Sequence, residues 1–68
     1  MRIDREKFAV LLIRKSMTAK QVAAVAGISN TSIYNVKKGM QCSDQMGNKI
    51  ARALGVDVTE IMEEVKQP

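Results

Sequence analysis

The chain has 68 residues, of which 46% are hydrophobic, and a net charge of +4 at neutral pH. This length permits one small domain held by apolar packing, since one cysteine makes no internal disulfide and no histidine is present to build a zinc site. The longest apolar run, 8–13, is too short to cross a membrane, and no signal-peptide core follows Met1, so we expect a cytoplasmic domain.

The charges are unevenly distributed along the chain. Residues 1–42 hold eight basic and two acidic side chains, a balance of +6, whereas residues 43–68 have a balance of −2. A basic front and an acidic back favour a protein that approaches a polyanion with one side, although ordinary solvated charge is the alternative.

The first predicted helix covers 5–15, with Asp4 as its N-cap. Its inward stripe consists of Phe8, Leu11 and Leu12. Three further apolar residues point roughly the other way. They are either scattered exposed residues, which are normal, or a second apolar face for a protein partner: Val10, Ile13 and Met17.

Residues 18–39 predict two short helices joined by a three-residue turn. Thr18 and Gln21 have the spacing of a capping box for the first helix, and Gly27 is suited to end it in the left-handed conformation. Ser29 can cap the second helix, which is expected to end at Gly39.

The second of these helices has two different faces. Ile33 and Val36 face inward at i and i+3. The outward residues at its start are polar and uncharged: Asn30, Thr31, Tyr34 and Asn35. A helix, a glycine turn and a second helix with such an outer face are typical of a helix-turn-helix that reads DNA.

Two more helices are expected in the second half. Ser43 caps a helix that Gly55 ends, and Gly47 inside it suggests the close approach of another helix. Asp57 begins a fifth helix that runs to Val65, and 66–68 are expected to fray. The sequence therefore predicts an all-α fold of five short helices in a single domain, 1–68.

The 18–39 segment resembles the helix-turn-helix of the lambda-repressor and Cro family, a system that also serves as the general example of this motif. The resemblance rests on Ala23, Gly27, an apolar residue at 28, Ser29 and the Ile33–Val36 pair; 50–62 resembles the family's fourth and fifth helices, so nearly the whole chain is covered. Two positions depart from the family pattern: Ala19, where glutamine is frequent, and Lys37, where glutamate is common.

The resemblance implies that the second helix of the motif lies in the major groove of double-stranded DNA. Base contacts are then expected from Asn30, Thr31, Tyr34 and Asn35. Phosphate contacts are expected on either side, from Thr18, Ala19, Lys20, Ser29, Ser32, Lys37, Lys38, Gln41, Ser43 and Gln45. It also implies a homodimer on a palindromic operator, with an interface formed by Val58, Ile61, Met62 and Val65. The alternative is that these residues, Ile61 above all, complete the core of the monomer.

These features predict a repressor- or Cro-type transcriptional regulator, encoded by a bacterium or a phage, that needs no cofactor. The alternative is a protein-interaction module, antitoxin-like or bound by an anti-repressor, that keeps the fold and uses another face. An enzyme is not expected, because the sequence has no histidine, no nucleophile motif and no phosphate-binding loop. A redox-sensing role for Cys42 stays open because the residue lies in the loop beside the expected DNA face.

Overall fold

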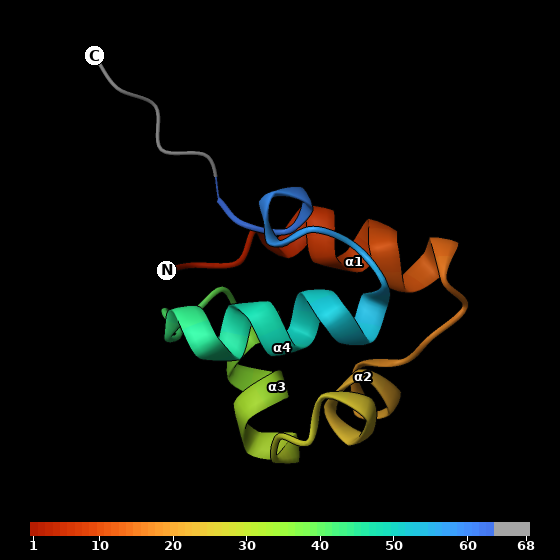
Figure 1. Ribbon diagram of the computed structural model, residues 1–68, viewed down its shortest axis with the longest axis horizontal. Helices are drawn as coiled ribbons and strands as arrows, with labels where there is room; N and C mark the ends of the chain where they lie inside the picture. Colours follow the sequence, from red (N-terminus) through yellow and green to blue (C-terminus); the bar gives the residue numbers. More distant parts are fainter. Residues whose placement is uncertain (64–68) are drawn as a thin grey trace.

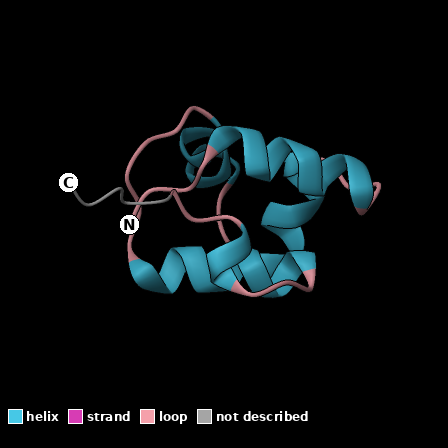
Figure 2. Ribbon diagram, turned by 90° about the horizontal axis from the view of Figure 1, so that it is seen from above, coloured by secondary structure: helices cyan, strands magenta, loops and turns pink. Residues whose placement is uncertain are grey.

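The structure, a computed structural model, describes residues 1–63. In this range the chain forms four α-helices and one turn of 3-10 helix: α1 (Arg5–Arg14), α2 (Ala19–Ala26), α3 (Asn30–Lys37), α4 (Asp44–Leu54) and η1 (Val58–Glu60). Figure 2 shows helices and loops and no strand among these residues. The all-α prediction is confirmed. Within the described part of the chain, each helix is too short or too polar to span a lipid bilayer.

The helices begin where the sequence places capping side chains. The carboxylate of Asp4 accepts hydrogen bonds from the backbone N–H groups of Glu6 at 2.9 Å and Lys7 at 3.1 Å. At the start of α4, the hydroxyl of Ser43 accepts from the N–H of Met46 at 3.1 Å. Each cap satisfies donors that have no partner inside the helix, which is why these polar residues fix the helix starts.

The helices enclose one aliphatic core around a single phenylalanine. Figure 1 shows α2 and α3 below α4, with α1 and η1 above it. α2 packs against both α3 and α4, α1 packs against α3, and η1 packs against α4. Every described element except η1 contributes apolar side chains to this core. The buried apolar side chains are those of Ile3, Phe8, Leu11, Val22, Ala23, Ile33, Val36, Ile50, Ala51, Leu54 and Ile61.

The N-terminal segment, 1–4, lies between two other segments of the chain. Met1 and Cys42 exchange two hydrogen bonds: the N–H of Cys42 donates to the carbonyl of Met1 at 2.7 Å, and the Met1 amine donates back at 2.8 Å. On the other side, the N–H of Asp4 donates to the carbonyl of Ile61 at 2.8 Å. These contacts form isolated bridges and no strand in the described residues, and they bring both ends of the described chain to the loop before α4.

The predicted fifth helix is replaced by the short turn η1. Its capping box is present, because the N–H of Asp57 donates to the Glu60 carboxylate at 3.2 Å. Ile61 then leaves the helical conformation, with φ of −121°, and its carbonyl pairs with the N-terminal segment. The pairing competes with helix continuation at this point. The expected helical residue Val65 and the tail 66–68 lie outside the described residues.

Gly47 is buried in α4, but not for the reason that the sequence suggested. A Cβ atom at this position would collide with the side chain of Met1, whose sulfur atom is nearest and whose Cε and Cγ atoms come next. The close neighbour is therefore the N-terminal methionine and not another helix.

Candidate nucleic-acid interface

The turn between α2 and α3 fixes the direction of the second helix. The hydroxyl of Thr18 accepts from the N–H of Gln21 at 3.1 Å, and the Gln21 side chain accepts from the Thr18 N–H at 2.8 Å, which completes the capping box. Gly27 ends α2 with φ of +73°, a left-handed conformation that glycine adopts without the strain other residues meet. Ile28 follows and packs against the core. The predicted helix, turn and helix are confirmed.

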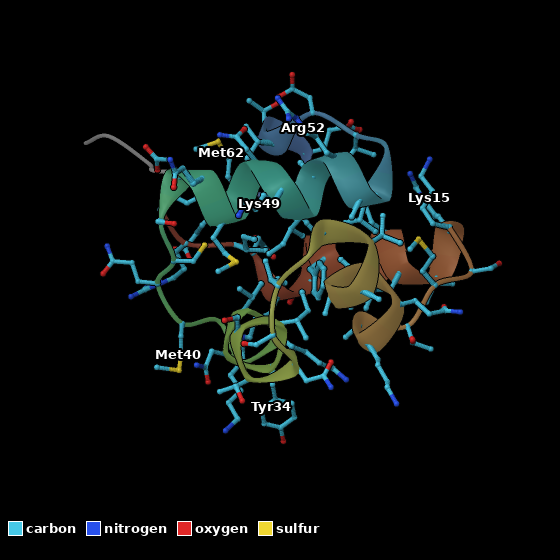
Figure 3. All side chains as sticks on the ribbon, turned by 60° about the horizontal axis from the view of Figure 1, so that its bottom comes forward. Lys15, Tyr34, Met40, Lys49, Arg52 and Met62 are labelled. Carbon is cyan, nitrogen blue, oxygen red and sulfur yellow. The ribbon has the colours of Figure 1, made fainter. Side chains whose placement is uncertain are left out.

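α3 has one buried face and one exposed face. Ile33 and Val36 are buried, whereas Asn30, Thr31 and Tyr34 are exposed. The ring of Tyr34 is 57% exposed and projects away from the rest of the chain, as Figure 3 shows. The structure thus brings three of the four expected base-reading residues onto one open surface, spaced at i, i+1 and i+4.

Asn35, the fourth expected reading residue, is half-buried. Its backbone carbonyl accepts from the N–H groups of Lys38 and Met40, both at 3.1 Å. Because the residue is half-buried, it has less open surface than Asn30. The carboxamides of both asparagines have no hydrogen-bond partner among residues 1–63, so their donors and acceptors are available to a ligand.

The start of α3 carries a hydroxyl pair. The Ser29 hydroxyl caps the helix by accepting from the Ser32 N–H at 3.0 Å, and it donates its own proton to the Ser32 hydroxyl oxygen at 2.9 Å. Because a hydroxyl has one proton to donate, Ser29 is occupied, while the proton of Ser32 is free to point outward. Of these two expected phosphate contacts, Ser32 keeps an uncommitted hydroxyl proton but is half-buried, whereas Ser29 is exposed.

Tyr34 and Lys38 form a contact that was not predicted from the sequence. The Lys38 ammonium nitrogen lies 4.6 Å from the centre of the Tyr34 ring, a distance within the range of a cation–π interaction. The spacing of i and i+4 on a helix is the signal that could have predicted it.

The expected phosphate contacts lie in two groups. At the start of α2, the N–H groups of Ala19 and Lys20 have no acceptor among the described residues, and Lys20 is exposed. Free N–H groups at a helix start attract anions. The second group surrounds the end of α3 and the start of α4, where all five expected side chains are exposed: Lys37, Lys38, Gln41, Ser43 and Gln45.

The surroundings of the second group include charged residues that the sequence did not lead us to expect there. Asp44 lies between Ser43 and Gln45; its carboxylate is 86% exposed and lies 3.8 Å from the Met1 ammonium, so an ion pair and not a lone positive charge stands beside these expected phosphate contacts. The side chains of Arg2 and Arg5 share an open cavity of about 570 Å³ with Lys38. Local patterns could not predict this neighbourhood, because it depends on the pairing of segment 1–4 with the loop before α4. The same cavity is lined by three acids: Asp4, Glu6 and Glu63.

The expected dimer residues differ in exposure. Ile61 has no exposed surface, so it is a residue of the monomer core and not a surface residue. Val58 and Met62 are half-buried, and Val65 lies outside the described residues. Of the four expected dimer residues, only Val58 and Met62 therefore present apolar surface to a partner in the part of the chain that is described.

The second apolar face of α1 is smaller than expected. Ile13 is 78% exposed and Val10 is exposed, but Met17 is half-buried and packs against the core. Met17 is therefore not part of that face.

Cys42 is half-buried beside the N-terminal segment. Burial, which outweighs the lowering effect of the Met1 amine, raises the pKa of its thiol. A raised pKa keeps the sulfur protonated and slow to react at neutral pH. The geometry gives no support to a redox-sensing role.

Comparison with solved structures shows the same fold inside larger proteins. Two similar structures are titled "Phpd with cadmium complexed with hydroethylphosphonate (HEP)" and "Native PhpD with Cadmium Atoms". Each has a TM-score of 0.80 and 24% identity over 98% of the present chain, which spans 15% of the length of those chains. At this identity the likeness concerns the fold alone. No curated protein matches the chain.

A protein-family model described as the Cro/C1-type helix-turn-helix DNA-binding domain matches residues 7–67. The match includes α2, the turn, α3 and the exposed polar surface of α3. It identifies a DNA-binding domain of the kind found in transcription regulators. The chain belongs to the Cro/C1-type helix-turn-helix DNA-binding family.

Proposed function

We propose that this protein is a repressor- or Cro-type regulator that binds a palindromic double-stranded operator as a homodimer in the cytoplasm. In this proposal α3 enters the major groove, and its first residues contact base edges. Binding at an operator would regulate transcription by occupying the site.

The observation that carries the proposal is the uncharged, exposed start of α3. Asn30 has a free carboxamide, whose donor and acceptor match the N6 and N7 atoms of adenine. Thr31 offers a hydroxyl and a methyl group, and Tyr34 offers a hydroxyl one turn further along. Neutral groups of this kind discriminate between bases without strong nonspecific attraction to the backbone, so they suit sequence reading.

Phosphate contacts would hold α3 in register. The start of α2 supplies two free N–H groups and Lys20, and the end of α3 supplies Lys37 and Lys38. These groups lie on both sides of the reading surface along the chain. Asn35 and Ser29 remain in the proposal as secondary contacts, since one is half-buried and the other is occupied as a cap.

The dimer follows from the size of the reading surface. One α3 of eight residues contacts few base pairs, whereas two copies can read half-sites about one helical turn apart. We propose that Val58 and Met62, together with Val65, form the contact between the two copies.

The experiment that tests the proposal is selection of bound sites from a random duplex pool at near-physiological salt. The expected result is an enriched motif with two-fold symmetry, and its half-site spacing should be close to one turn of the DNA helix. Folded protein that enriches no motif would contradict sequence-specific binding. An enriched motif without symmetry would contradict the dimer and leave the DNA-reading role in place.

The alternative, a module for a protein partner on α1, has less support. Its face is reduced to Val10 and Ile13, and isolated exposed apolar residues are normal on small domains. The DNA-reading proposal is therefore the one that the geometry favours.

A further inference from the structure

The exposed face of α3 contains one fixed pair, Tyr34 and Lys38. The two residues are one helical turn apart, and the ammonium nitrogen of Lys38 lies 4.6 Å from the ring centre of Tyr34. The backbone beneath the pair is held as well, because the N–H of Lys38 donates to the Tyr34 carbonyl at 3.1 Å. Lys38 is the C-cap of α3, so both side chains start from hydrogen-bonded backbone.

No hydrogen bond, ion pair or second ring contact among residues 1–63 holds the Tyr34 ring. The ring is 57% exposed, and its hydroxyl has no hydrogen-bond partner in the described part of the chain. Lys38 forms no ion pair there either, so its charge is not held elsewhere. Lys38 is therefore the one charged group among the described residues that contacts the ring.

We propose that Lys38 is a positioning residue for Tyr34, so that discrimination at the base that Tyr34 meets depends on the cation above its ring. This inference rests on the proposed DNA-reading function and adds a residue that determines its specificity. A ring already held in its bound orientation loses less conformational freedom when it docks against a base edge.

The same ammonium group can still contact a phosphate. It has three N–H donors, and contact with a ring face leaves the others free. A phosphate contact alone contributes affinity on every duplex and does not depend on sequence. The positioning role is different, because it predicts a loss of discrimination at one base position.

Lys37 provides a matched control. It is an exposed lysine on the same helix, one residue before Lys38, and it is not stacked on the ring. Lys37→Met and Lys38→Met remove the same charge from neighbouring positions at the end of α3. A difference between these two variants in base discrimination therefore reports the ring contact and not the charge.

The test measures affinity for the selected site and for each of its single-base variants, at several salt concentrations. We expect Lys38→Met to reduce discrimination at one base position about two- to fivefold, the range for an exposed cation–π contact. Lys37→Met should weaken binding to all duplexes alike and leave base discrimination unchanged at every position. Lys38→Arg should restore discrimination, because guanidinium also binds ring faces. On a Tyr34→Leu background, Lys38→Met should have no further effect on discrimination.

A measurement without DNA separates failure of this inference from failure of the proposed function. In the free protein, ring currents should shift the NMR signals of the Lys38 ε-methylene protons upfield from those of Lys37, and Tyr34→Leu should abolish the shift. Unshifted signals would overturn the positioning role. So would an unchanged base profile in Lys38→Met with a reduced salt slope, which would make Lys38 a phosphate contact only. A wild-type protein that selects no site would instead overturn the proposed function, and the positioning role with it.

Discussion

Asn30 is the residue on which sequence reading should depend most strongly. It is the first residue of α3, it is exposed, and its carboxamide has no partner among residues 1–63. We predict that Asn30→Ala weakens binding to the selected site by about 1–3 kcal/mol and leaves binding to a scrambled duplex nearly unchanged. Fluorescence anisotropy with both duplexes would measure the difference.

A second exposed asparagine serves as the control for this prediction. Asn48 lies on α4, where its amide donates to the Asp44 carbonyl at 2.9 Å. Asn48→Ala should leave the preference for the selected site unchanged. If Asn30→Ala lost the same affinity on both duplexes, Asn30 would be a general contact and not a reader of bases.

At the residue scale, the sequence predicted correctly, except at half-buried Asn35, which residues of α3 are exposed and which are buried. The exposed positions of Asn30, Thr31 and Tyr34 follow from the 3.6-residue period and from the buried pair Ile33 and Val36. It could not predict which hydroxyls and ammonium groups are already engaged. The Ser29–Ser32 hydrogen bond depends on side-chain rotamers, which a helical pattern does not specify.

Two glycines end helices in the same way, and they provide a test of the α2–α3 turn. Gly27 and Gly55 have φ of +73° and +72°, and no atom lies within 4 Å of a Cβ built at either position. Since there is room for the methyl group, only the backbone conformation opposes an L-residue. We predict that Gly27→Ala and Gly55→Ala each lower the free energy of unfolding by about 1–2 kcal/mol in urea titrations.

The same positions with a D-residue should behave in the opposite way. A D-alanine placed at position 27 by chemical synthesis favours positive φ. It should therefore leave the free energy of unfolding unchanged or raise it by at most about 1 kcal/mol. Equal destabilisation by L- and D-alanine would mean that crowding, and not backbone conformation, determines the effect.

The cap of η1 predicts how stability depends on pH. Hydrogen bonds from the backbone N–H and then the hydroxyl of Thr59, each 2.9 Å long, lower the pKa of Asp57 below its ordinary value of 3.8. Because the pKa is lower in the folded state, the stabilisation is present above 3.8 and is lost as the pH falls through the folded value.

Asp57→Asn provides the comparison, since the amide oxygen keeps an acceptor and has no titration. The unfolding free energy of the wild type should exceed that of Asp57→Asn near neutral pH, and the difference should shrink in acid. The titration of the other carboxylates contributes equally to both proteins, so it cancels in this difference. A difference that stayed constant with pH would show that the Asp57 charge does not stabilise the cap.

At the element scale, local signals predicted the beginnings of helices and failed where distant segments compete. The caps at Asp4, Thr18, Ser29, Ser43 and Asp57 are all present. The fifth helix was predicted too long, because Ile61 pairs with the N-terminal segment. That pairing connects positions almost sixty residues apart and leaves no periodic trace in the sequence.

The whole molecule presents its reading surface and its proposed dimer contact on different sides. Figure 3 shows Tyr34 at one edge of the view and Met62, with Arg52, at the opposite edge. A partner bound at Met62 would therefore leave the exposed start of α3 free. The charge difference between the two halves of the chain also fits this division, since the basic half contains α2 and α3.

The dimer can be tested with a charge at its proposed contact. Met62 is half-buried after η1, and Met62→Glu would place a carboxylate between the two copies. We predict that this variant is monomeric in analytical ultracentrifugation and binds the full operator on the order of a hundredfold more weakly, because the gain from two linked reading heads is lost. Binding to an isolated half-site should stay the same, since α3 is unchanged.

Ile13→Glu is the matched control, because it adds the same charge to the exposed face of α1. It should retain both the dimer and full operator affinity. The two variants together decide which apolar surface is used: loss of dimerisation only in Ile13→Glu would move the interface to α1. Loss in neither variant, with the wild type still dimeric, would place the contact at residues other than Met62 and Ile13. A wild type that is monomeric both alone and on its operator would contradict the dimer itself.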